Sequence, residues 1–488
     1  MGPRVQCLPV PSLTHAQRNA VEQLLRVSPI IAELGSLYGA AGEQLYLVGG
    51  SVRDALLGGL AHDLDLATSA SPEVSHALLK RFSSTTWDIG AKFGTIGAKR
   101  TDGATEWVVE VTTFRADAYE PDSRRPIVAF GDNLNDDLAR RDFTINAMAL
   151  DVTTNEFIDP YGGLTDLAAG VLRTPAAPEI SFSDDPLRMM RAARFASRLG
   201  FRVAPEALQA MRDLAERISI VSVERIQGEL NGLLLTDSPR AGLDLLVRTG
   251  LADHVLPEVA GLRRVVDEHH RHKDVYEHSL TVLEQSIALE KARGHAPDLV
   301  GRLAALLHDI GKPATRRFEG RKVTFHHHDV VGAKLTTKRL RALAYPTAVV
   351  KSVSKLVELH LRFHGYADGE WTDSAVRRYV RDAGDELERL HILTRSDSTT
   401  RNQAKATRLR RSYEELEWRI DELASQEELA AIRPDLDGTQ IMEILGIGPG
   451  PQVGAAYRFL LEHRVEHGPS DPDQAAQLLH QWWATREA

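Results

Sequence analysis

The pattern of apolar and polar positions divides the chain into a mixed first part and a helical second part. Residues 14–40 carry apolar side chains at helical spacing, which predicts an amphipathic lead-in helix. From Ser183 onward nearly every segment has helical periodicity, interrupted by Gly or Pro as at Gly200 and Pro313. Between these parts, short apolar runs that each predict a strand lie at 45–48, 63–66, 95–98 and 107–114. We therefore expect an α+β protein whose head contains a mixed β-sheet.

The stretch LVGGSVRDALLGGLAHDLDLATS, residues 47–69, combines a strand, a glycine pair, an Arg-Asp pair and a D-x-D motif. Gly49 and Gly50 let the backbone approach a bulky ligand, because glycine has no Cβ. A helix predicted over 52–57, which includes Arg53, offers the free N–H groups of its first turn to a phosphate.

Asp63 and Asp65 alternate on the second strand of this stretch, so both carboxylates point to one face of a sheet. Mg²⁺ prefers oxygen ligands and is commonly held by one or two carboxylates together with substrate phosphates. The pair is therefore a candidate site for Mg²⁺-dependent phosphoryl or nucleotidyl transfer. The alternative is a surface turn with two solvated aspartates.

A second motif, RRDFTINAMAL, lies at 140–150. The Arg141 guanidinium matches triphosphate oxygens bidentately, and the Asn146 amide can bond a sugar or phosphate. The alternative is an ordinary helix start with Asp142 as N-cap. The glycine-rich DPYGGLTDLAAGVLRT at 159–174 is interpreted as a connector.

A third motif, DDPLRMMRAARF, lies at 184–195. On a predicted helix, Asp185 and Arg188 share a face, and Arg191 and Arg194 continue that row. An Asp beside an Arg presents one acceptor and one donor, which fits the Watson–Crick edges of cytosine and adenine, whereas uracil and guanine show the reverse pattern. The alternative is a surface salt bridge worth only a few tenths of a kcal/mol.

Histidine and aspartate recur through the helical second part in an order that predicts a metal site. Imidazole and carboxylate ligands suit an unidentified divalent transition metal. The candidate ligands are His278, His308, Asp309, His328, His360 and Asp397. The choice between His327 and His328 stays open, and the alternative is a relic domain that only supports RNA binding.

Composition narrows the class of protein. A chain of 488 residues suggests about three domains, and its single cysteine, Cys7, excludes an intramolecular disulfide and fits a reducing cytoplasm. We expect no signal peptide, and no apolar run of about 18 residues predicts a membrane span. The net charge of −9 argues mildly against nucleic acid, but only one face need be basic. Two local runs qualify: Arg188, Arg191, Arg194 and Arg198, and Arg401, Lys405, Arg408, Arg410 and Arg411.

These motifs, in this order, resemble the class II tRNA nucleotidyltransferases, which comprise the CCA-adding enzymes and the bacterial poly(A) polymerases. The resemblance covers about 45–230 and departs at Asp184, where the family usually has Glu. It rests on the glycine and D-x-D motifs, Arg-Arg-Asp-Phe-Thr-Ile-Asn at 140–146, Asp-Pro-x-Gly-Gly at 159–163, Asp185 with Arg188, and Glu-Arg-Ile-x-x-Glu at 224–229. The later histidines resemble an HD phosphohydrolase domain, matched at His278, His308, Asp309 and Asp397.

The resemblance implies template-free addition of C, C and A from CTP and ATP to the tRNA 3′ end, with release of pyrophosphate. It implies catalytic roles for Asp63, Asp65 and Glu110, and a flexible loop at 115–130 that helps the switch from C to A addition. It implies that His328 and His360 are extra metal ligands. The nucleotide-binding residues that it implies are Gly49, Gly50, Arg53, Arg141, Asp142, Asn146, Asp185, Arg188, Arg191 and Arg194.

The expected organisation is a palm-type head followed by an extended all-α neck and body with a helical HD domain. The expected boundaries give a lead-in at 1–43, a head at 44–178, a neck at 179–262, an HD domain at 263–400 and a tail at 401–488. We expect tRNA along the neck and C-terminal helices, with the basic run at 401–411 as a contact. Two alternatives stay open: a relative that adds poly(A), only CC or only A, and an HD phosphohydrolase whose head merely binds RNA. The oligomeric state is not indicated by the sequence.

Overall fold

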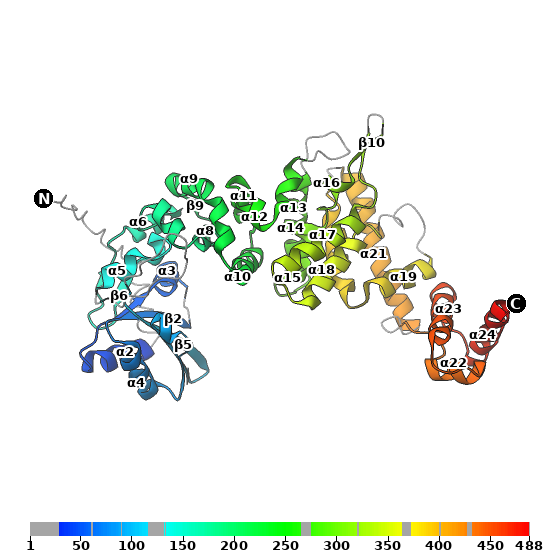
Figure 1. Ribbon diagram of the computed structural model, residues 1–488, viewed down its shortest axis with the longest axis horizontal. Coiled ribbons are helices and arrows are strands. Elements are labelled where there is room, and N and C mark those ends of the chain that lie inside the picture. Colours follow the sequence, from blue (N-terminus) through cyan, green and yellow to red (C-terminus); the bar gives the residue numbers. More distant parts are fainter. Residues whose placement is uncertain are drawn as a thin grey trace. The chain divides into compact units, whose positions relative to one another are not determined.

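The computed structural model, drawn in Figure 1, describes most of the chain. The chain divides into two compact units, with the division between Val255 and Leu256. The described residues are 29–59, 62–88, 90–115, 131, 133–264, 275–319, 322–363, 372–399, 402–426 and 432–487. The predicted loop at 115–130 lies outside them except for its first residue, as does the part of the lead-in helix before Pro29. Within these ranges, no helix is both long and apolar enough to cross a membrane.

The first unit contains the predicted mixed sheet, with seven strands in the order β3-β4-β5-β2-β1-β6-β7. Among the described strands, β2 and β5 pair in parallel, and the other neighbouring pairs of this sheet are antiparallel. The strands are β1 (Leu45–Val48), β2 (Asp63–Thr68), β3 (Thr85–Trp87), β4 (Thr95–Asp102), β5 (Thr105–Thr113), β6 (Ala149–Asp151) and β7 (Phe157–Ile158).

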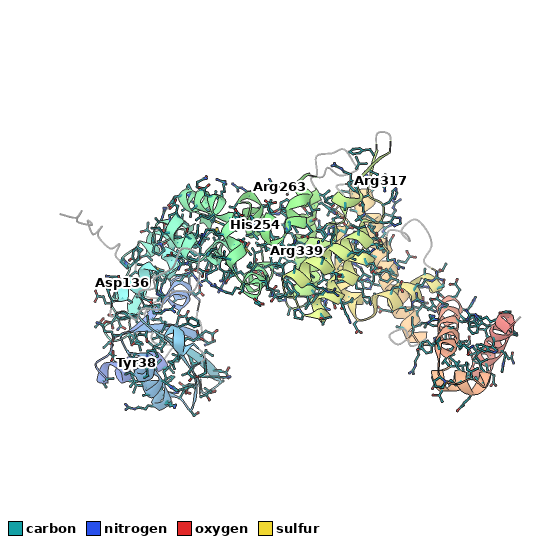
Figure 2. The ribbon with its side chains drawn as sticks, in the orientation of Figure 1. Tyr38, Asp136, His254, Arg263, Arg317 and Arg339 are labelled. Atoms are coloured by element: carbon teal, nitrogen blue, oxygen red, sulfur yellow. The ribbon has the colours of Figure 1, made fainter. Side chains whose placement is uncertain are left out.

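Helices α2 (Pro29–Ala40) and α4 (Pro72–Phe82) lie together beside this sheet (Figure 1). A local cap begins α4: the Ser71 hydroxyl accepts a hydrogen bond from the Val74 N–H at 3.3 Å, and Pro72 occupies the first turn. Tyr38 of α2 is fully buried (Figure 2), as are alternate residues of β5 such as Val109 and Val111. The other face is covered at Tyr46 and Ala67, which pack against Leu134 and Leu138, and is exposed at Asp63 and Asp65.

Three short helices complete the head around the glycine-rich and arginine-rich motifs: α3 (Gly50–Leu56), α5 (Leu134–Ala139) and α6 (Gly163–Ala169), together with a 3₁₀ turn at Thr144–Asn146. The 159–174 motif forms a turn that leads into α6, and its interpretation as a connector stays a prediction. The Asp159 carboxylate accepts hydrogen bonds from the backbone N–H groups of Gly163 and Leu164 at 2.7 and 2.9 Å. A Cβ on Gly163 would lie 2.2 Å from the Thr144 carbonyl oxygen, so only glycine fits there.

The rest of the first unit is helical. Its elements are α7 (Pro178–Asp184), α8 (Leu187–Leu199), α9 (Pro205–Asp213), a 3₁₀ helix at Ala215–Ile220, α10 (Val223–Leu234), α11 (Arg240–Arg248) and α12 (Leu251–Val255), with a small parallel pair, β8 (Val171–Leu172) and β9 (Arg202–Val203).

The prediction that Asp185 and Arg188 share one helix is wrong. Asp185 follows the end of α7 with φ −137° and ψ 97°, and α8 begins only at Leu187. The reason is Pro186, whose ring disfavours the helical region for the preceding residue. Leu187, Met190 and Phe195 of α8 are buried.

The second unit is almost entirely helical, as predicted. Its first part contains α13 (Pro257–Gly261), α14 (Val275–Ala292), α15 (Leu299–Leu307), α16 (Lys312–Thr315), α17 (His328–Ala342), α18 (Thr347–Leu359), α19 (Asp373–Ala383), α20 (Leu387–Asp397) and α21 (Gln403–Gln426). Helices α22 (Gly438–Leu445), α23 (Pro451–His467) and α24 (Pro472–Glu487) follow and enclose a small apolar core of their own.

One element of the second unit was not predicted, a hairpin of β10 (Arg317–Glu319) and β11 (Lys322–Thr324), on which Arg317 is labelled in Figure 2. Pro313 does not end a long helix but stands in the first turn of α16, a position where proline is tolerated because that N–H has no helical partner.

Candidate active sites

Three carboxylates lie on one exposed face of the head sheet. Asp63 and Asp65 alternate with buried residues along β2, and Glu110 of β5 stands directly opposite Asp65 in the parallel register. Partial desolvation raises the pKa of Asp65; Arg141 lowers it and Asp63 raises it, with a net rise. Desolvation and the charges of Asp65 and Asp63 raise the pKa of Glu110. This crowding of negative charge and the all-oxygen donor set fit a bound divalent cation.

Gly49 and Gly50 lie against this cluster. Gly49 has φ 69°, and a Cβ there would lie 2.9 Å from Arg141 Nη1 and 3.7 Å from Asp65 Oδ2. A Cβ on Gly50 would lie 3.4 Å from Arg53 Nη2 and 3.9 Å from Asp65 Oδ2. The two glycines therefore allow two guanidinium groups to approach the backbone beside the carboxylates, where a triphosphate needs positive charge.

A buried chain of polar contacts links these arginines to α8. Arg53 Nη1 donates to Asn146 Oδ1 at 2.6 Å, and Asn146 Nδ2 donates to Asp142 Oδ1 at 2.9 Å. The other carboxylate oxygen, Asp142 Oδ2, lies 2.8 Å from Arg191 Nε and 2.6 Å from Arg191 Nη2. Burial acts to raise the pKa of Asp142, but Arg191 and Asn146 outweigh it and lower the pKa to about 2. The chain therefore contains an ionised carboxylate that fixes Arg191 and Asn146.

Two further carboxylates in this region were not predicted to have a role. Asp137, fully buried on α5, holds Arg140 Nη2 at 2.6 Å and Arg141 Nη2 at 3.0 Å. Glu229 of α10 accepts from Arg194 Nε at 2.6 Å and lies 3.5 Å from Arg191 Nη1. The signals were present, because Asp137 precedes two arginines at helical spacing and Glu229 ends the motif at 224–229.

Asp185 and Arg188, the predicted base-reading pair, contact other partners. Arg225 of α10, which was not predicted, donates from Nη2 to Asp185 Oδ2 at 2.8 Å. Arg188 is buried and donates to Ser181 Oγ at 2.7 Å and to the Arg140 carbonyl oxygen at 2.6 Å. Arg188 therefore joins α8 to the head, and the base-reading role of the pair stays a prediction.

The second unit brings all six predicted metal ligands together. They form two groups, His278, His308 and Asp397, and Asp309, His328 and His360, and within each group the candidate ligand atoms lie within 4.8 Å of one another. His278 Nε2 lies 2.9 Å from Asp397 Oδ1, and His308 Nε2 lies 3.3 Å from Asp309 Oδ2. Of the two histidines between which the choice was open, His328 is buried and lies in the cluster, whereas His327 is exposed.

Hydrogen bonds orient the imidazole rings toward the centre of this cluster. Nδ1 of His308, His328 and His360 lies 2.9, 2.8 and 2.6 Å from the carbonyl oxygen of the residue three positions earlier. A carbonyl only accepts, so each Nδ1 carries a proton and each Nε2 is turned away from the backbone toward the cluster. His360 Nε2 is buried and has no hydrogen-bond partner among the described residues. An orphaned imidazole nitrogen beside carboxylates is the donor set of a metal centre.

The pKa shifts in the cluster indicate that it favours positive charge at its centre. Burial acts to lower the pKa of His308, but Asp309 and Asp397 outweigh it and raise the pKa to about 10. Burial and the charge of His308 lower the pKa of His360 to about 4. The cluster thus favours one positive charge and disfavours a second protonated imidazole. A metal cation would supply positive charge while the imidazoles that bind it stay neutral.

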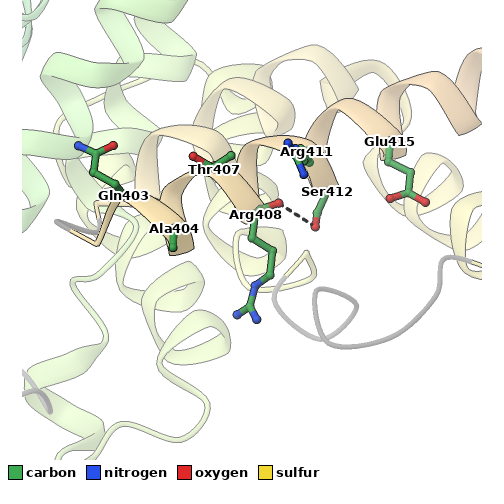
Figure 3. A pocket seen from close by; sticks show the side chains of 7 residues that line it. All are labelled: Gln403, Ala404, Thr407, Arg408, Arg411, Ser412 and Glu415. Atoms are coloured by element: carbon green, nitrogen blue, oxygen red, sulfur yellow. Dashed lines mark hydrogen bonds between the residues drawn. The ribbon is translucent and has the colours of Figure 1, made fainter.

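The predicted basic run lies at the start of α21, where Arg408 and Arg411 line an open surface pocket of about 540 Å³ (Figure 3). Both side chains are exposed, and neither forms an ion pair with a described residue. Arg410, which does not line the pocket, lies 3.9 Å from Glu414. Arg401 lies outside the described residues, and so does the side chain of Lys405.

Comparison with known families divides the chain in the same order as its sites. Residues 45–173 match the Poly A polymerase head domain, residues 200–262 match the Probable RNA and SrmB-binding site of polymerase A, and residues 275–402 match the HD domain. The structure also resembles the crystal structure of the Bacillus stearothermophilus CCA-adding enzyme in complex with CTP, at 25% identity and a TM-score of 0.60 over 97% of this chain and 99% of that one.

Two curated relatives show how far the sequence similarity extends. The CCA-adding enzyme of Enterococcus faecalis is 39% identical over 269 residues, which is 54% of this chain but only 63% of that protein. The A-adding tRNA nucleotidyltransferase of Deinococcus radiodurans is 34% identical over 443 residues, which is 89% of this chain and 95% of that protein. The chain therefore belongs to the tRNA nucleotidyltransferase family of enzymes, and it carries the HD domain in addition.

Proposed function

We propose that the head and neck add nucleotides to the 3′ end of tRNA without a template, taking C, C and A from CTP and ATP and releasing pyrophosphate. The observation that carries this proposal is the cluster of Asp63, Asp65 and Glu110 beside the guanidinium groups of Arg53 and Arg141. The similarity to A-adding and CCA-adding enzymes supports tRNA as the acceptor.

The residues divide the work of this reaction. Mg²⁺ held by Asp63 and Asp65 would supply charge neutralisation at the α-phosphate and at the departing pyrophosphate. Arg53 and Arg141 bind phosphate oxygens, while Glu110 adds a carboxylate near the attacking 3′-hydroxyl. Asp185 and Arg188 are proposed to accept the Watson–Crick edges of cytosine and adenine. The metal roles follow from the donor set, and Mg²⁺ itself is part of the proposal.

Removal of either carboxylate tests nucleotidyl transfer. Asp63→Asn and Asp65→Asn should each lower the rate of nucleotide addition by about 10³-fold or more, because each removes charge where the transition state needs it. Glu106→Gln is a matched control, since Glu106 is an exposed carboxylate of the same sheet that pairs with Lys99. Normal addition of CTP or ATP by Asp63→Asn would refute the assignment.

Which nucleotides are added requires a separate experiment, because the relative matched over most of the chain is an A-adding enzyme. A tRNA that ends before CCA is supplied with CTP, ATP or both, and a tRNA that ends in CC is supplied with ATP. Completion of CCA on the first acceptor supports the proposal. Addition only of A to the second acceptor, arrest at CC, or a long A tail would each replace it with the corresponding alternative.

We also propose that the HD domain is a metal-dependent phosphohydrolase. The observation that favours it is the buried His360 Nε2, which has no hydrogen-bond partner among the described residues, in a cluster of four imidazoles and two carboxylates. A bound divalent transition metal would supply an activated water at neutral pH. Phosphate release from nucleotides and cyclic phosphates is measured with Mn²⁺, Co²⁺ or Ni²⁺. Release that is lost in Asp309→Asn but kept in Asp63→Asn supports a separate second activity. Absence of release with each metal contradicts it, and release with no nucleotide addition would favour the phosphohydrolase alternative.

The division of the chain into five parts at residues 43, 178, 262 and 400 is likewise a proposal. It is supported by the family matches at 45–173, 200–262 and 275–402.

A further inference from the structure

One aromatic side chain shares the exposed sheet face with the carboxylates. The strand registers place Glu110 opposite Asp65, Gly97 opposite Glu110, and Trp87 opposite Gly97. Residues that stand directly opposite one another in neighbouring strands point to the same face. Asp65, Glu110, Gly97 and Trp87 therefore form one row across four strands, at right angles to the strand direction.

The Trp87 indole lies over Gly97, which brings it close to the carboxylates. A Cβ built on Gly97 would lie 2.0 to 2.3 Å from three indole atoms, Cε2, Nε1 and Cζ2. Gly97 is buried under this ring, whereas Trp87 itself is only half-buried. Since neighbouring strands are about 4.8 Å apart, the ring stands roughly one strand spacing from Glu110 and two from Asp65.

Asp65 has different neighbours on its two sides along this row. On the side of β1, Gly49 and Gly50 bring Arg141 and Arg53 against Asp65. On the side of β5, β4 and β3 stand Glu110 and then the Trp87 ring. In nucleotidyl transfer, the attacking hydroxyl and the departing pyrophosphate lie in line on opposite sides of the α-phosphorus. If the arginine side binds the triphosphate, the acceptor 3′ end must approach from the side of Trp87.

We propose that Trp87 is a positioning residue that stacks on the base of the acceptor's 3′-terminal nucleotide and so holds its hydroxyl near Glu110. This inference rests on the proposed function of the head. Stacking suits the task, because every base has a π-face and the terminal base of the acceptor changes with each addition. A hydrogen-bonding subsite fitted to one base edge would reject the next acceptor in the series.

Two substitutions separate stacking from packing. Trp87→Leu keeps an apolar cover on Gly97 but removes the aromatic face, whereas Trp87→Phe keeps both. We expect Trp87→Leu to raise the KM for acceptor tRNA roughly five- to hundredfold, the range expected when one base no longer stacks, with the KM for CTP or ATP unchanged. Trp87→Phe should stay within about threefold of the wild type. Equal losses in both variants, or a change confined to the nucleotide KM, would overturn the proposal.

An acceptor whose 3′-terminal nucleotide lacks its base provides the decisive comparison. The wild type should use this abasic acceptor poorly, and Trp87→Leu should use it no worse than the wild type does, because the partner of the indole is already gone. If Trp87→Leu lowers addition by the same factor on intact and abasic acceptors, the ring only supports the sheet and the proposal fails. Failure of the proposed function would look different, since the wild type would then add no nucleotide to the intact acceptor.

Discussion

Individual side chains of both sites could be predicted where chemistry depends on local spacing. Alternation along β2 placed Asp63 and Asp65 on one face, and the order of histidines identified all six members of the HD cluster. The partners of Arg188 could not be predicted, because Ser181 and Arg140 reach it through contacts that only the folded chain creates. Arg225 was missed for the same reason.

The depressed pKa of Asp142 makes a prediction about stability and pH. The pKa of Asp142 is about 2 in the folded chain, whereas the pKa of an aspartate in an unfolded chain is about 3.9. The ionised carboxylate therefore stabilises the fold by roughly 2 to 3 kcal/mol at neutral pH, and this contribution is lost progressively as the pH falls from about 5 toward 2. Asp142→Asn should lower the thermal midpoint of the first unit at pH 7, and its difference from the wild type should shrink between pH 5 and pH 3.

Thermal unfolding followed by circular dichroism at several pH values measures this difference. Asp136→Asn is the control, because Asp136 is an exposed carboxylate on the neighbouring helix α5 (Figure 2). A difference that stays constant from pH 7 to pH 3 would contradict the electrostatic role of Asp142.

Base selection is a second prediction at the residue scale. Asp185→Asn should lower the preference for CTP and ATP over UTP and GTP by about tenfold or more. The reason is that the amide of asparagine replaces one acceptor oxygen of the carboxylate with an N–H donor. The measurement is kcat/KM for each of the four nucleotides on one acceptor. Glu224→Gln, an exposed carboxylate on α10, serves as control. Unchanged selectivity in Asp185→Asn would remove it from base reading. Arg188→Ala is a less specific variant, because it also breaks the hydrogen bonds with Ser181 and Arg140.

At the scale of elements, the strands and helices followed from periodicity, and their ends from single residues. The start of α4 at Ser71 and Pro72 is an example of such an end, because a cap is a local signal. The break between α7 and α8 was not predicted, although Pro186 disfavours a helical conformation at Asp185. The spacing of Asp185 and the following arginines also fits one continuous helix. The β10–β11 hairpin was missed because its strands have only three residues each.

The exposed face of α21 carries a prediction about tRNA affinity. Replacement of Arg408 and Arg411 by Gln together should flatten the slope of log affinity against log salt by about one for each phosphate that the variant no longer neutralises. Arg410→Gln is the matched control, with the same kind of charge change outside the pocket in Figure 3. Binding is measured by filter retention or fluorescence anisotropy between about 50 and 200 mM salt. An equal slope in the double variant and the wild type would exclude this face from the tRNA site.

At the scale of the whole molecule, the chain is two compact units that each carry a candidate metal site. The head carboxylates belong to the first unit, and all six candidate ligands of the HD cluster belong to the second. The order of the parts could be predicted from the order of the motifs. The division between Val255 and Leu256 could not, because helical periodicity continues on both sides of it.

Metal binding should therefore stabilise the units separately. We expect scanning calorimetry to resolve two transitions, and Mn²⁺, Co²⁺ or Ni²⁺ at about 100 times its dissociation constant should stabilise the unit that binds it by about 2.7 kcal/mol. Asp309→Asn should abolish the shift of the second-unit transition, and Asp63→Asn should leave that shift intact. A chelator should reverse it. A metal-dependent shift that survives Asp309→Asn would contradict the site.

Three imidazoles of the HD cluster are oriented by main-chain carbonyl oxygens, those of Ala305, Phe325 and Val357. Every residue type has a carbonyl, so point mutation at these three positions replaces a side chain but leaves the acceptor in place. Mutation can therefore remove a ligand side chain, but it cannot remove the carbonyl oxygen that orients it. Loss of one ligand side chain should therefore leave the acceptors that orient the other imidazoles in place, so the site can be restored by replacing that one residue.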